Sequence, residues 1–272
     1  MLKTVVKGFI VGSSMMIPGV SGGSMAMILG EYDRLIAAIP SIFSKKTFFS
    51  SLKYLLTFVV AALLGILIVA RPLEVLIARY SLILMYLFLG AVCGTIPMMV
   101  KKAHSEGFDL PSLVYIIIGI VLVFSIELIP EGIFNPSLDV SFFDVMIQIL
   151  GGILVSIGLV LPGISTSYLL LVLGLYEPII SALSNNQFVS LIPIVLGLLV
   201  GILALTTILQ IAMERYPKIT YMMILGFLLG SIKEIYPGLP DGWGILIAMI
   251  LFIIGFIVVY ELSLFEERNG DE

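Results

Sequence analysis

Long apolar stretches, separated by short polar, proline and glycine breaks, dominate the chain. Ten of them are expected to be helical, near residues 4–17, 24–39, 52–70, 82–100, 112–128, 142–161, 167–183, 190–211, 219–232 and 244–260. Most approach the roughly 20 residues with which a helix crosses a hydrocarbon layer of about 30 Å. Within each stretch the apolar residues are nearly continuous, without the alternation of a membrane β-barrel. The pattern therefore predicts an all-α integral membrane protein.

The first stretch differs from the others because it is short and carries charge. It contains Lys3 and Lys7 and stops at Pro18-Gly19, so it cannot span the membrane if both lysines stay in water. We expect it to form one half of a re-entrant helical hairpin. A cleavable signal peptide explains it less well, since more apolar helix follows instead of a small-residue cleavage site. We predict a single membrane domain over 1–272, with a short cytoplasmic tail at 261–272.

An internal repeat is visible in the sequence. Residues 18–39 align without gaps to residues 162–183 with eight identities, and Gly90 and Gly94 later align with Gly226 and Gly230. The pattern predicts one repeat over 1–128 and a second over 142–260. Five segments separate equivalent points, and because five is odd, the two copies are expected to be inverted. Inverted repeats are typical of transporters, although duplication can also simply build a stable bundle.

Each copy has a Pro-Gly-x-Ser tip between two apolar stretches. Irregular backbone at membrane depth is tolerated where protein buries it or where it lines a wet cavity. The start of the helix after each tip would present free N–H groups and hydroxyls, a combination that favours a compact anion such as phosphate or carboxylate. Alternatively, these small residues only allow close helix packing. The candidate binding residues are Pro18, Gly19, Ser21, Gly22, Gly23, Ser24, Gly163, Ser165, Thr166 and Ser167.

A few charged residues are further candidates. Arg79 and Arg215 occupy equivalent Arg-Tyr pairs and could contact phosphate oxygens, or they could simply snorkel to the membrane interface. Three carboxylates near the tips, Glu31, Asp33 and Glu177, could carry coupling protons. Alternatively, they end their helices in water.

Composition and charge exclude several classes of protein. The chain is 60% apolar and 12% charged, and its net charge of -4 comes without a basic stripe, so nucleic-acid binding has no support. A single cysteine, Cys93, excludes an internal disulfide framework and a cysteine-rich metal site, and we expect no metal or cofactor. Eleven lysines and arginines fall on one predicted face and three on the other. By the positive-inside rule, both termini are expected in the cytoplasm.

The tips IPGVSGGS (17–24) and LPGISTS (161–167), the run GEYDRLI (30–36) and the duplicated layout together resemble the polyprenyl-phosphate transporter family of prokaryotic membrane proteins. The resemblance implies translocation of undecaprenyl phosphate, the lipid carrier of cell-wall sugars, back across the cytoplasmic membrane for reuse. It implies a transporter of the flippase type and not an enzyme, with the lipid and the bilayer as partners.

Two alternatives stay open. One is a polyprenyl-diphosphate phosphatase, although such chemistry usually relies on a histidine or clustered carboxylates, and the one histidine, His104, falls in a polar loop. The other is a carrier for a small water-soluble anion, since a helix-end cradle does not identify its ligand.

Overall fold

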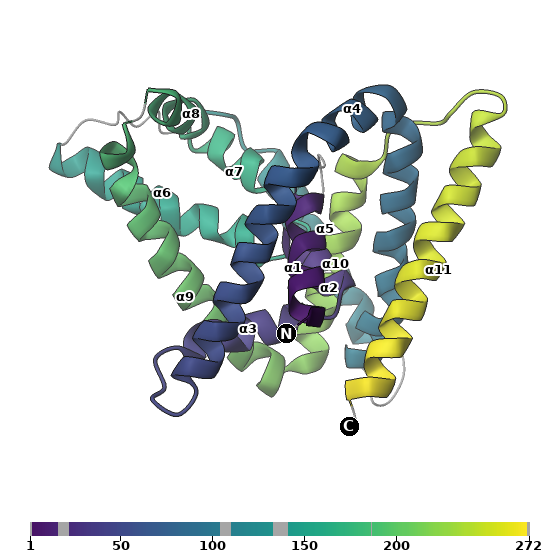
Figure 1. Cartoon of the computed structure of the whole chain (residues 1–272), viewed down its shortest axis with the longest axis horizontal. Coiled ribbons are helices and arrows are strands. Elements are labelled where there is room, and N and C mark those ends of the chain that lie inside the picture. Colours follow the sequence, from purple (N-terminus) through teal and green to yellow (C-terminus); the bar gives the residue numbers. More distant parts are fainter. Residues whose placement is uncertain (1, 16–21, 104–109, 133–140, 186, 271–272) are drawn as a thin grey trace.

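Helices provide all the regular secondary structure of the computed structural model, which describes residues 2–15, 22–103, 110–132, 141–185 and 187–270 (Figure 1). In chain order they are α1 (Leu2–Ser14), α2 (Gly22–Ile28), α3 (Tyr32–Ser41), α4 (Phe48–Ala103), α5 (Leu110–Glu127), α6 (Phe142–Val160), α7 (Thr166–Val172), α8 (Tyr176–Ser184), the 3-10 helix η1 (Phe188–Leu191), α9 (Ile192–Arg215), α10 (Pro217–Ile235) and α11 (Gly244–Gly270).

Six helical stretches of the described residues are long and apolar enough to cross a membrane. Two lie within α4, and the others lie in α5, in α6, across η1 and α9, and in α11. Large apolar side chains on α4, α5, α9 and α11 are exposed, as expected for surfaces that face lipid. The prediction of an all-helical, multi-pass membrane protein is thus confirmed.

The break expected between residues 70 and 82 is present as a kink within α4, between the two membrane-spanning stretches Phe48–Val69 and Leu84–Lys101. Residues 71–79 are helical even though Pro72 lies among them, and the non-helical backbone is at Tyr80 (φ -134°). Tyr216, the residue aligned with Tyr80, has the same φ of -134° and separates α9 from α10. The two copies therefore bend at equivalent positions. At the other end of the chain, α11 continues to Gly270 through most of the predicted tail.

The stretches expected over 24–39 and 167–183 are each divided in two by a glycine. Gly30 (φ 66°) ends α2 and Gly174 (φ 67°) ends α7, both in the left-handed conformation that glycine adopts without strain. In both copies the glycine N–H and the following N–H bond back to carbonyl groups three and five residues earlier. This is the Schellman arrangement, and it closes each short helix before the chain turns into α3 or α8.

The packing between the two halves is reciprocal. Gly90 of α4 lies against the Phe252 carbonyl of α11, and Gly226 of α10 lies against the Ile116 carbonyl of α5. A shift of 136 positions relates the two contacts: it takes Gly90 to Gly226 (226 minus 90), and it takes Ile116 to Phe252 (252 minus 116). The glycine of each contact therefore corresponds to the glycine of the other, and the carbonyl residue to the carbonyl residue. The equivalent helices of the two halves thus use the same contact surfaces.

Two of the long helices run in opposite directions in Figure 1. The first part of α4 runs from the lower to the upper side of the view, whereas α9 runs downwards. The lower side also holds α3, the beginning of α1 and the end of α11, while α8 lies at the upper side.

Candidate functional site

The second Pro-Gly-x-Ser tip is a break between two helices, as the sequence predicts. Helix α6 ends at Val160, and α7 begins at Thr166. Gly163 between them has φ +84°, and a Cβ atom there would collide with the Phe227 carbonyl of α10, so only glycine fits. Ser165 caps α7, its Oγ accepting a hydrogen bond from the Tyr168 N–H at 3.3 Å. Ser165 and Thr166 are half-buried.

The first tip is only partly described. Pro18, Gly19 and Ser21 lie outside the described residues, as do the side chains of Ser24 and Ser167. Gly22 and Gly23 open helix α2. A Cβ atom at Gly23 would lie 3.3 Å from the Val160 carbonyl oxygen and 3.4 Å from the Pro162 Cα atom. The start of α2 therefore lies directly against the second tip.

A hydrogen bond strengthens this contact between the two halves. The Tyr32 hydroxyl at the start of α3 donates to the Val160 carbonyl oxygen at 2.9 Å, and Tyr32 is buried. The Val160 carbonyl belongs to the last turn of α6, where the helix leaves carbonyls without a helical partner. Gly23 and Tyr32 thus anchor the first half to the end of α6, just before the second tip.

Glu31 lies in a buried network of charged and polar groups and does not end its helix in water. Its residue is 4% exposed. Lys7 Nζ lies 3.2 Å from Oε1, and the Tyr54 hydroxyl donates to Oε2 at 2.7 Å. Arg34 Nη1 is 3.8 Å from Oε2, and its guanidinium lies 4.1 Å from the centre of the Tyr54 ring. The network joins α1, α3 and α4 around one carboxylate.

The Lys7 side chain is correspondingly only 12% exposed, although the sequence led us to expect it in water. The sequence analysis also missed Tyr54. One signal was available: Lys7 aligns with Gly151 and Glu31 with Leu175, so both charges are absent from the second copy. A Cβ atom at Gly151 would lie 2.6 Å from Leu175 Cδ1, which places the same two positions in contact there. The ion pair of the first copy is an apolar contact in the second.

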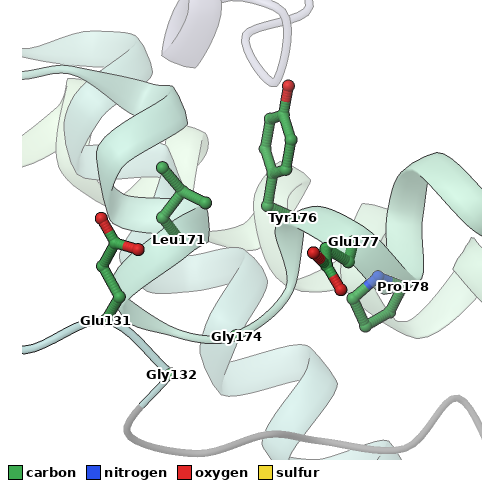
Figure 2. Close-up of a pocket in the computed structure, with 7 residues that line it drawn as sticks. All are labelled: Glu131, Gly132, Leu171, Gly174, Tyr176, Glu177 and Pro178. Atoms are coloured by element: carbon green, nitrogen blue, oxygen red, sulfur yellow. The ribbon is translucent and has the colours of Figure 1, made fainter.

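The other two candidate carboxylates have different surroundings. Asp33 is half-buried, and the Tyr221 hydroxyl of α10 donates to its Oδ2 at 3.1 Å. Glu177 is exposed, and together with Glu131 it lines a cavity of about 550 Å³ beside the turn between α7 and α8. Figure 2 shows these two carboxylates with Gly174 between them. Of the three carboxylates, Glu31 is the one buried next to a lysine.

Arg79 and Arg215 are both exposed at bends of the chain. Arg79 lies where α4 kinks, with its guanidinium 5.8 Å from the Tyr80 ring. Arg215 ends α9 and lines a cavity of about 330 Å³ that it shares with Lys218. The α4 bend and the turn from α9 into α10 lie on opposite sides of the molecule in Figure 1, so the two arginines are not brought together.

Metal binding and histidine chemistry were also considered for the described part of the chain. No group of three or more His, Cys, Asp or Glu side chains there is placed to hold a metal ion. His104, on which the phosphatase alternative would depend, lies outside the described residues.

Membrane-crossing helices, a broken helix whose tip meets the other half, and a buried charge network are features of multi-pass membrane proteins of the transporter class. More particularly, the chain belongs to the VCA0040-like family, described as undecaprenyl phosphate translocase-like, whose model matches residues 11–241. The family expected from the tips and the duplicated layout is therefore confirmed.

Two relatives carry the same name. The chain is 31% identical over 277 residues to a polyprenyl-phosphate transporter of Staphylococcus aureus, with 97% of each chain covered. It is 26% identical over 248 residues to a polyprenyl-phosphate transporter of Vibrio cholerae, covering 87% of this chain and 78% of the relative. No solved structure gives a significant match.

Proposed function

We propose that this protein translocates undecaprenyl phosphate across the cytoplasmic membrane, so that the carrier lipid can be used again in cell-envelope synthesis. The family match and the names of the two relatives support this substrate. The observation that carries the mechanism is the contact of Gly23 and Tyr32 with the end of α6 and the second tip. It brings the two repeats together at the irregular backbone where an anion would bind.

In this mechanism the paired tips hold the phosphate headgroup while the polyprenyl tail stays in lipid beside the bundle. Ser165 uses an oxygen lone pair to cap α7, so its hydroxyl proton remains able to donate to a phosphate oxygen. Thr166 is half-buried beside it and supplies a second hydroxyl. The other tip residues of both copies, including Ser21, complete the proposed cradle.

We also assign the two halves to inverted repeats with re-entrant hairpins at the tips. The opposite directions of α4 and α9 and the opposite positions of α3 and α8 support this arrangement. Helix α1 has 13 residues, about 20 Å at 1.5 Å per residue, which is shorter than the hydrocarbon layer. Rocking of one repeat against the other would expose the headgroup site to each side of the membrane in turn.

Among the three candidate proton carriers, Glu31 is the best supported for coupling. Glu31 is buried beside Lys7 and Arg34 in a charge network that joins three helices, whereas Glu177 is exposed. We assign the lower side of Figure 1, where α1 begins and α11 ends, to the cytoplasm, because most lysines and arginines fall on that predicted face.

The test is a proteoliposome assay that follows how fast the phosphate of undecaprenyl phosphate becomes accessible to a reagent that cannot cross the membrane. Wild-type protein should speed this movement over protein-free vesicles. Ser165→Ala combined with Thr166→Ala should slow it about tenfold or more, because hydrogen bonds to a charged group contribute about 1.5–3 kcal/mol. Ser184→Ala is the matched control, since the Ser184 hydroxyl is exposed on α8 and donates to the Ile180 carbonyl.

Equal rates for wild-type protein and empty vesicles would contradict the function, and equal rates for wild-type and the tip variant would contradict the site. The same preparation separates the alternatives. Release of inorganic phosphate from undecaprenyl diphosphate would indicate a phosphatase, and uptake of inorganic phosphate or citrate in place of the lipid would indicate a carrier of small anions.

A further inference from the structure

A second anion site is suggested by the cavity where α9 turns into α10, at the lower side of the molecule in Figure 1. Its volume is about 330 Å³. Two cationic residues, Arg215 and Lys218, line it together with Tyr115, Tyr216 and the two prolines Pro111 and Pro217. None of the carboxylate residues of the described chain is among the residues that line it.

The surroundings of this cavity suit a lipid. Helix α5 packs on α10, whereas α5 and α9 make no extensive contact with each other, so the cavity lies between the start of α5 and the turn from α9 into α10. On α9, Ile211 and Ile208 lie one and two turns before Arg215 on the same face, and both are exposed. On α5, Ile118 and Leu122 lie one and two turns after Tyr115 and are exposed as well. Two apolar stripes therefore lead from the cationic cavity towards the middle of the membrane.

We propose that this cavity binds the phosphate headgroup of polyprenyl phosphate in the cytoplasmic leaflet, as the site where the lipid enters or leaves the protein. A phosphomonoester carries a charge of about -1.5 to -2 at neutral pH, which a guanidinium and an ammonium group together can balance. Arginine binds phosphate oxygens through two parallel N–H donors. The assignment of the leaflet and of this particular lipid rests on the proposed function.

The pair of cations is present in only one of the two copies. The shift of 136 positions pairs Arg215 with Arg79, but it pairs Lys218 with Leu82 and Pro217 with Ser81. The opposite bend therefore keeps its arginine and has leucine at the position of the second cation. A protein that collects its phosphate lipid mainly from one leaflet, or delivers it there, needs this asymmetry.

Crosslinking tests the site independently of transport. A benzophenone amino acid that replaces Ile118 places the crosslinker on the apolar stripe of α5. The protein is reconstituted in nanodiscs that contain radiolabelled undecaprenyl phosphate. The protein should form an adduct with the lipid, and Arg215→Gln combined with Lys218→Gln should lower the yield at least tenfold. Arg71→Ala is the matched control, because Arg71 is an exposed arginine elsewhere on α4, and it should leave the yield unchanged. Glutamine retains much of each side-chain stem, and an unchanged thermal unfolding midpoint verifies the fold.

Three lipid and phosphate arms define the ligand. Undecaprenol, which lacks the phosphate, should give little adduct, and phosphatidylglycerol should give much less than undecaprenyl phosphate. Inorganic phosphate at the concentration of the lipid should not compete. Equal crosslinking of phosphatidylglycerol, effective competition by inorganic phosphate, or a full adduct yield in the double glutamine variant would each overturn the proposal.

The two proposals fail in distinguishable ways. A wild-type protein that gives the charge-dependent adduct but moves no lipid in proteoliposomes would contradict the function and leave the headgroup site in place. A wild-type protein that moves the lipid, with a double glutamine variant that moves and crosslinks it equally well, would contradict the headgroup site alone.

Discussion

At the scale of single residues, the Lys7–Glu31 pair is the feature that most separates the two copies. Both side chains are largely removed from solvent, and Tyr54 adds a hydrogen bond to the carboxylate. Burying two charges carries a large desolvation cost, and the pair stabilises the protein only as long as both partners are present. The corresponding Gly151–Leu175 contact needs no such compensation.

Removal of one partner should therefore cost more than removal of both. Glu31→Leu leaves Lys7 without its carboxylate and should lower the free energy of unfolding by about 3 kcal/mol or more. Lys7→Ala combined with Glu31→Leu resembles the second copy and should recover about 1 kcal/mol or more of that loss. Thermal and denaturant unfolding in one detergent measures both variants.

The Lys233–Glu127 pair provides the control. Its N–O distance is 2.8 Å, but the lysine side chain is mostly exposed, so Lys233→Ala should cost less than about 1 kcal/mol. A double variant at Lys7 and Glu31 that is less stable than Glu31→Leu alone would show that the charges stabilise the protein independently of each other.

Of the residues in this network, Glu31 was a candidate from the sequence, whereas Tyr54 was missed and Lys7 was expected in water. Glu31 attracts notice because it is a carboxylate near the first tip, inside the apolar stretch 24–39. Its partners are far away in sequence, and the choice between a buried pair and two solvated ends depends on the packing of α1 against α4. Arg79 and Arg215 were found from the sequence because they occupy equivalent Arg-Tyr pairs. The cavity around Arg215 is also lined by Tyr115 of α5, and the hydropathy pattern does not show that α5 lies there.

At the scale of helices, close approach at glycine determines how the halves meet. Gly90 and Gly226 each lie against a carbonyl group of the partner helix, so any side chain would force the helices apart. The sequence paired these glycines by alignment, but it could not show which helix each of them contacts.

Equal substitutions at the two crossings should have equal effects. Gly90→Ala and Gly226→Ala should each lower the free energy of unfolding by about 2 kcal/mol, within the usual 1–3 kcal/mol cost of overpacking. Gly244→Ala at the start of α11 is the comparison variant: its Cβ would lie 3.1 Å from Pro240 Cβ and not against backbone of a packed helix, so it should lose less stability than either crossing variant. Unfolding midpoints measure all three, and a loss at only one crossing would contradict the reciprocal packing.

Helix boundaries show what hydropathy can and cannot predict. The break at Pro162-Gly163 was expected because proline and glycine both disfavour a continuous helix. The breaks at Gly30 and Gly174 were missed, since a single glycine is often tolerated within an apolar helix. Residues 71–79 were expected to lie between two helices because Arg71, Pro72 and Arg79 interrupt the apolar pattern, and the structure confines the break to a kink at Tyr80.

At the scale of the whole molecule, the arrangement of the two halves predicts which loops share a side of the membrane. The segment between α3 and α4 lies at the lower side of Figure 1, and the segment between α10 and α11 lies at the upper side. Most of the helices, and their order along the chain, were predicted from hydropathy and the internal repeat. The opposite directions of the two copies were predicted from the odd number of segments between equivalent points, and this inversion stays a prediction.

Cysteine labelling tests the orientation directly. In a Cys93→Ser background, Phe43→Cys and Leu239→Cys place single thiols at residues that are 73% and 82% exposed. A maleimide that cannot cross the membrane should label Leu239→Cys in intact cells and Phe43→Cys only after permeabilisation. Both variants must react once the membrane is opened, which controls for thiol reactivity. Labelling of both positions in intact cells, or the reverse order, would contradict the orientation.

The reciprocal contacts also mean that each half lends its last helix to the other. Helix α5 comes from the first half and packs on α10, while α11 comes from the second half and packs on α4. Since each half contributes a helix to the packing of the other, we expect neither to complete its core in the bilayer until both have been inserted.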